Sequence, residues 1–81
     1  MYTGRKVLPL SLLPPGSRGR IVSVDAGHGL RRRLLSMGFM PGQEIRVLQV
    51  VGGVVLVRLG SSSTTVALCR GMAQKILVEV F

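Results

Sequence analysis

The hydrophobic and polar positions along the chain predict short β-strands more than helices. Several runs are rich in β-branched residues, and in the best of them apolar and polar positions alternate, as expected for strands that bury one face. Residues with a preference for turns separate these runs. The pattern predicts five strands, at residues 18–24, 44–51, 54–59, 64–68 and 76–80.

Glycines mark the sharpest reversal of the chain. Gly52 and Gly53 lie between two valine-rich runs, and both residues tolerate the positive φ of a two-residue hairpin turn. We therefore predict a hairpin formed by residues 44–51 and 54–59. Side chains alternate in a strand, so its many valines cannot all point inward. The outward ones would form a self-association surface, for a weak homodimer, or a docking patch.

One segment has helical periodicity instead. Leu30, Leu34 and Met37 fall on one face of a short amphipathic helix over residues 30–37. Gly38 suits the left-handed position that ends a helix, and Phe39 can then pack on Leu34 in a Schellman motif. The sequence 40–43 follows, with Pro41 and Gly42 in the two central positions of a type II turn.

The remaining segments predict little regular structure. Residues 1–7 form a loose N-terminal segment, residues 8–16 hold a short turn at most because of their prolines, and residues 26–29 form a loop. Residues 70–75 form a single helical turn before the last strand. Leu10, Leu12 and Leu13 are expected to cover one end of the core. A chain this short can fill the interior of a small barrel. We therefore predict a mainly β fold, a small SH3-like β-barrel, that forms a single domain over residues 1–81.

The amino-acid composition restricts the possible functions more than it restricts the possible folds. The 81 residues include 11 Lys and Arg against three acids, a formal charge of +8 that attracts nucleic acid, an anionic membrane surface or an acidic protein face. The acids, Asp25, Glu44 and Glu79, stand far apart in sequence, so catalysis by paired carboxylates is disfavoured and we expect no enzyme. Uncharged stretches reach only about a dozen residues, too few to span a bilayer. Without a signal peptide either, we expect a cytoplasmic protein.

Metal-binding chemistry is sparse. Cys69 is the single cysteine and His28 the single histidine, and a metal site built on them needs further donors. We therefore expect no required cofactor and at most weak binding of Fe²⁺ or Zn²⁺. Cys69, beside apolar neighbours, is expected to be a small buried hydrophobe.

Arg31, Arg32 and Arg33 are the clearest candidates for binding a partner. Three consecutive guanidinium groups on a short helix cannot all be buried, and each suits bidentate pairing with a carboxylate or phosphate. The same pattern also fits a solvated helix face, or a structural ion pair of one arginine with Asp25 or Glu44.

Taken in order, these motifs resemble the FeoA family of ferrous iron transport proteins, and the similar barrel at the C-terminus of some iron-dependent repressors. The most specific part is the block with Arg31–Leu34, Met37–Phe39 and Pro41–Gly42. The other matching residues are Leu10, Leu13, Pro15, Gly16, Gly19, Ile21, Val24, Leu68, Ala73 and Ile76.

The resemblance implies a non-enzymatic accessory protein that docks on the cytoplasmic GTP-binding region of the ferrous iron transporter FeoB. Two alternatives stay open: an SH3-like barrel that binds nucleic acid through its basic surface, and a stand-alone relative of the repressor barrel. Nucleic acid is the weaker partner, since one Tyr, two Phe and no Trp leave few rings for base stacking.

Overall fold

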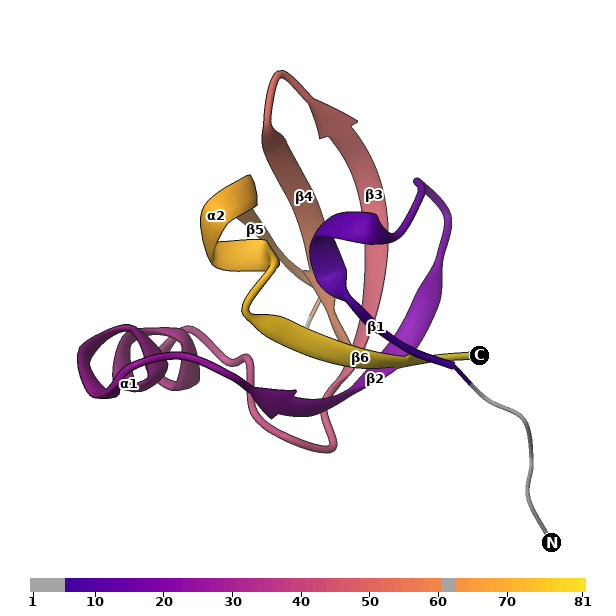
Figure 1. The fold of residues 1–81 in the computed structure, drawn as a ribbon. Helices are drawn as coiled ribbons and strands as arrows, with labels where there is room; N and C mark the ends of the chain where they lie inside the picture. The colour runs from indigo at the N-terminus through magenta and orange to yellow at the C-terminus, as the bar shows by residue number, and fades with distance from the viewer. Residues whose placement is uncertain (1–5, 61–62) are drawn as a thin grey trace, which may run out of the picture.

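The computed structural model describes residues 6–60 and 63–81, which form one curled antiparallel sheet with short helices at its margins (Figure 1). The strands are β1 (Val7–Pro9), β2 (Arg18–Val24), β3 (Glu44–Val51), β4 (Val54–Leu59), β5 (Thr64–Cys69) and β6 (Ile76–Val80). The helices are the 3₁₀ turn η1 (Leu10–Leu12), α1 (His28–Ser36) and α2 (Arg70–Ala73). The mainly β architecture is confirmed, with one more strand than expected.

The six strands lie in the order β1-β6-β2-β3-β4-β5, and every neighbouring pair is antiparallel. The additional strand, β1, pairs with β6 at the edge of the sheet. Its prediction failed because Pro9 lacks an N–H and three residues give no alternation to detect. Val7 therefore belongs to a strand and not to a loose segment, while residues 1–5 of that segment lie outside the described residues.

The β3–β4 hairpin has the predicted turn. Gly52 and Gly53 have φ of 55° and 81°, the two positive values that a type I′ turn requires. Val51 stands opposite Val54, yet beyond the turn the register shifts by one residue between Val47 and Gln49. Leu48 is thus the extra residue of a β-bulge. The shift lets Val47 and Val57 stand opposite each other, and both side chains are fully buried.

A second bulge occurs where β2 pairs with β6, between Ile21 and Ser23. Ile21 and Val24 are three positions apart, so a regular strand would place them on opposite faces. The extra residue, Val22, returns Val24 to the inner face, and both Ile21 and Val24 are buried. Both bulges therefore keep apolar side chains in one core.

The core consists entirely of apolar side chains, and none of the polar side chains in the described residues is buried. Every strand except β1 contributes, together with η1, α1, α2 and the segments next to them. Leu10 and Leu13 cover one end as expected, whereas Leu12 is 62% exposed, because it lies on the outer side of the 3₁₀ turn. The buried residues are Leu10, Leu13, Ile21, Val24, Leu34, Phe39, Ile45, Val47, Val55, Val57, Leu59, Leu68, Ala73, Ile76 and Val78.

Gly19 lies where β2 comes closest to β6, and it provides a test of this packing. A Cβ atom there would lie 2.5 Å from Val78 Cγ1 and 2.6 Å from the Glu79 carbonyl oxygen. Because backbone cannot move aside cheaply, we expect Gly19→Ala to lower the free energy of unfolding by about 1–3 kcal/mol in urea denaturation.

The matched control is Gly29→Ala. Gly29 is helical and has no atom within 4 Å of an added Cβ, so alanine should leave stability unchanged or raise it by about 0.5 kcal/mol. Equal stability of the two variants would contradict the close approach at Gly19.

Candidate functional site

The candidate site is the segment from α1 to the turn that leads into β3, which carries the three consecutive arginines. The helix begins at His28, two residues before the expected start, because Gly27 is extended and its carbonyl accepts the first helical hydrogen bond, from Arg31 N at 2.9 Å. The loop predicted at residues 26–29 is therefore shorter than expected. In Figure 1 the helix stands out to one side of the sheet.

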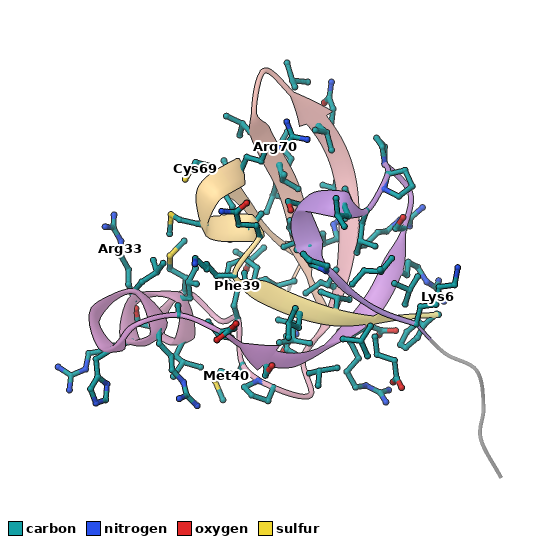
Figure 2. All side chains as sticks on the ribbon, viewed as in Figure 1. Lys6, Arg33, Phe39, Met40, Cys69 and Arg70 are labelled. Carbon is teal, nitrogen blue, oxygen red and sulfur yellow. The ribbon has the colours of Figure 1, made fainter. Side chains whose placement is uncertain are left out.

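The helix ends in the predicted Schellman motif. Gly38 has φ of 105°, its N–H donates to Leu35 O at 3.1 Å, and the Phe39 N–H donates to Leu34 O at 3.0 Å. Leu34 and Phe39 are both fully buried, and Phe39 points from this exit toward the sheet (Figure 2). Full burial of such a ring stabilises the fold by roughly 1.5–3 kcal/mol. The motif thus fixes the end of α1 to the core.

The turn after Phe39 is also as predicted. Gly42 has φ of 92°, and the Gln43 N–H donates to Met40 O at 3.0 Å, as in a type II turn. The turn is tied to β2 in both directions, since Gly42 N–H donates to Ile21 O at 2.7 Å and Ile21 N–H donates to Gln43 O at 2.9 Å. The helix exit therefore has a rigid connection to the sheet.

This scaffold leaves all three arginines in solvent. Arg31, Arg32 and Arg33 are exposed, and among the described residues no ion pair satisfies any of them. Arg33 extends from α1 into solvent in Figure 2, and it occupies the last turn, where a cation is favourable for the helix dipole. Arg32 lines a shallow, open hollow of about 280 Å³ with His28 and Gly29. The surface is therefore basic and accessible.

The two weak metal candidates do not assemble into a centre. His28 is the first residue of α1 and Cys69 the last of β5. Within residues 6–60 and 63–81, no group of three or more His, Cys, Asp or Glu side chains could hold a metal ion. Cys69 is exposed, so its expected burial is wrong. It stands opposite Val54 with its side chain on the outer face, while its neighbour Leu68 is the buried one.

Apolar side chains are exposed at the far end of the β3–β4 hairpin, as the excess of valines predicted. Val50, Val51 and Val54 are 43%, 57% and 37% exposed, and Leu48 at the bulge is 36% exposed. The hairpin extends beyond the core at the top of Figure 1. Val50, opposite the buried Val55, faces the inner side of the hairpin, and Val51 and Val54 face the outer side, so apolar side chains are accessible on both faces of this end.

The structure also groups three arginines that the sequence pattern did not single out. Arg18 of β2, Arg46 of β3 and Arg58 of β4 stand opposite one another in register. Each faces outward at an alternating position, which the sequence does show. Their alignment depends on the Leu48 bulge, which has no distinctive residue type, so the row could not be read from the sequence.

The model of the FeoA domain matches residues 8–80, which include every strand and helix except the first residue of β1. The chain belongs to the FeoA domain family. A relative named Fe(2+) transport protein A, from Methanocaldococcus jannaschii, is 34% identical over 71 residues, which are 88% of this chain and 84% of that protein.

Solved FeoA structures have the same fold. A crystal structure of an iron uptake regulatory protein, FeoA, has a TM-score of 0.86 and 32% identity, covering 94% of this chain and all of the other. The zinc complex of Stenotrophomonas maltophilia FeoA, a prokaryotic SH3 domain protein, has a TM-score of 0.76 and 31% identity, with 89% of each chain covered. The SH3-like fold is therefore confirmed.

The repressor barrel is similar as well. A manganese-dependent transcriptional repressor has a TM-score of 0.86 and 26% identity over 93% of this FeoA-family chain, but only 37% of the repressor is covered. The two FeoA structures described above match over 100% and 89% of their own length, which favours the FeoA interpretation. Among residues 6–60 and 63–81, no helix has the length and apolar character that crossing a membrane requires.

The helix exit can be tested at Gly38. Valine resists positive φ, and a Cβ there would lie 2.8 Å from Leu59 Cδ1. We expect Gly38→Val to lower stability by about 2 kcal/mol, a fall in melting temperature of roughly 10 °C. Gly38→Asn, which tolerates this conformation better, should lose less. A loss as large in Asn as in Val would assign the effect to contact with Leu59 and not to the backbone.

The exposure of Cys69 can be tested with a thiol reagent. Because the side chain is accessible, Ellman's reagent should modify native protein within a few-fold of the rate for urea-unfolded protein. Cys69→Ser should change stability by less than about 0.5 kcal/mol. If the native protein reacted many times more slowly than the unfolded protein, and Cys69→Ser lost much stability, Cys69 would be buried as the sequence predicted.

Proposed function

We propose that this chain is a non-enzymatic accessory protein of ferrous iron uptake, which docks on the cytoplasmic region of a FeoB-type transporter. The observation that carries the proposal is the match to the FeoA domain over residues 8–80. The Stenotrophomonas maltophilia relative has been suggested to be a ferrous iron transport activating factor, which supports a regulatory role. Such a role places the protein in the cytoplasm, and it needs no resident cofactor.

The surface that we propose for docking is α1 with the turn after it. The arginines at 31–33 offer donors for carboxylates, and Met40, 53% exposed, adds an apolar contact at the adjoining turn. Both lie on backbone that the Schellman motif and the hydrogen bonds to Ile21 hold in place. A surface organised before binding loses little entropy when a partner docks.

Replacing Arg31, Arg32 and Arg33 together with Ala tests this surface. Alanine favours helix, so the fold should persist with little change in melting temperature. Exposed ion pairs contribute about 0.2–1 kcal/mol each, so losing three should weaken docking on the transporter roughly 3- to 150-fold. The measurement is an NMR titration of isotope-labelled protein with the cytoplasmic region of its own transporter at physiological salt.

The matched control replaces Lys6, Arg70 and Lys75 with Ala. These three cations are exposed and lie outside α1, and their replacement removes the same amount of positive charge. Equal weakening by both triple variants would show a general charge effect. Absence of localised shifts with the soluble region and with the full transporter in nanodiscs would contradict docking. A short RNA that binds more tightly than the transporter would favour the nucleic-acid alternative.

A further inference from the structure

The outward face of the sheet carries two cross-strand rows of charged residues with opposite character. In one row Arg20 of β2 stands opposite Glu79 of β6 and Glu44 of β3, so a residue of opposite charge occupies the neighbouring position on each side. In the next row Arg18, Arg46 and Arg58 stand opposite one another, and the fourth member is Thr65 of β5. Opposite charges in such pairs are stabilising, and like charges are destabilising. The second row therefore costs stability in the free protein.

The three arginines of this row, which we call the arginine row, are accessible. All three are exposed, and no ion pair satisfies them among the described residues. They line a shallow depression of about 170 Å³ together with Glu44, Ile45 and Gly60. The neighbouring row differs, since the Arg20 guanidinium lies 5.5 Å from the centre of the Phe81 ring. A destabilising arrangement at an open depression is typical of a binding site.

We propose that the arginine row binds an acidic helix of a partner protein, through carboxylates spaced along one helix face. Neighbouring strands lie about 4.8 Å apart, so the row spans about 10 Å from Arg18 to Arg58. Carboxylates at positions i, i+4 and i+7 of a helix cover the same length at 1.5 Å per residue. Side chains two apart on an extended strand are about 6.7 Å apart, a poorer match to successive arginines.

Charge on the same face favours discrete carboxylates over a nucleic-acid backbone. Glu44 lines the depression beside the arginines, and a continuous polyanion laid across it would meet that carboxylate. An acidic helix presents negative charge at chosen positions and leaves the others neutral. Guanidinium groups also pair with carboxylates in a bidentate manner. This inference does not depend on docking to a transporter, because the arginine row and α1 are different surfaces.

The test uses the full chain and a capped alanine-based peptide of about 20 residues, long enough to be helical, with Glu at i, i+4 and i+7. A counterpart with Gln at these positions is the control peptide. In an NMR titration at physiological salt, shifts should centre on amides of β2, β3 and β4. Arg46→Gln should weaken binding about tenfold. Arg70→Gln on α2, an exposed cation outside both surfaces with the same loss of charge, should change binding less than twofold.

Stability supplies an independent readout. Arg46 lies between two arginines, so Arg46→Gln should raise the melting temperature of the free protein by roughly 2–5 °C. Arg20→Gln, the same substitution on the same face, should lower it, because Arg20 lies between two glutamates. A structural role for Arg46 would lower the melting temperature in both variants.

Three outcomes would overturn the proposal. Binding of the Gln peptide as tight as that of the Glu peptide would exclude carboxylate recognition. Equal losses in Arg46→Gln and Arg70→Gln, or shifts centred on α1, would exclude the arginine row. Displacement of the Glu peptide by a short RNA or by inorganic phosphate at physiological salt would assign the row to phosphate groups.

Discussion

The fold depends on a conflict between turn and core that the Leu48 bulge resolves. The buried positions of β3 and β4 are all odd-numbered, at Ile45, Val47, Val55, Val57 and Leu59. A two-residue turn with Val51 opposite Val54 pairs each odd position with an even one, which would place Arg58 opposite the buried Val47. One extra residue in β3 corrects the pairing. The tight glycine turn and the apolar core can therefore coexist only with a bulge between them.

The same register decides what the outer surface carries. Once Val47 stands opposite Val57, Arg46 must stand opposite Arg58, since successive side chains alternate. Pairing of β2 with β3 then adds Arg18 to the row. The grouping of three like charges is thus a consequence of packing the core. Neutral residues at these outward positions would fit the same fold, so the core does not require arginine there.

Sequence reasoning worked where local chemistry is decisive. The bounds of β2, β3, β4 and β6 agree with the prediction, because β-branched runs between turn residues leave little choice. Gly38 correctly predicted the end of α1, and Gly42 correctly predicted the turn before β3. Few residues other than glycine readily adopt the positive φ values of these two positions. Prediction failed for β1, which depends on its pairing with β6, and for Cys69, whose orientation follows from the register of β5. The arginine row could not be predicted, because the alignment of Arg46 with Arg58 depends on the position of the bulge, which only the strand pairing shows.

Charge balance links the fold to a need for partners. The chain has three acids against 11 Lys and Arg, and two of the acids, Glu44 and Glu79, stand beside Arg20. Glu44 also lines the depression of the arginine row, and the third acid, Asp25, directly follows β2. Compensation within the chain is therefore impossible for most of these cations. Their charge is balanced by solvent ions in the free protein, and release of those ions favours any acidic surface that fits the rigid arrangement of the guanidinium groups.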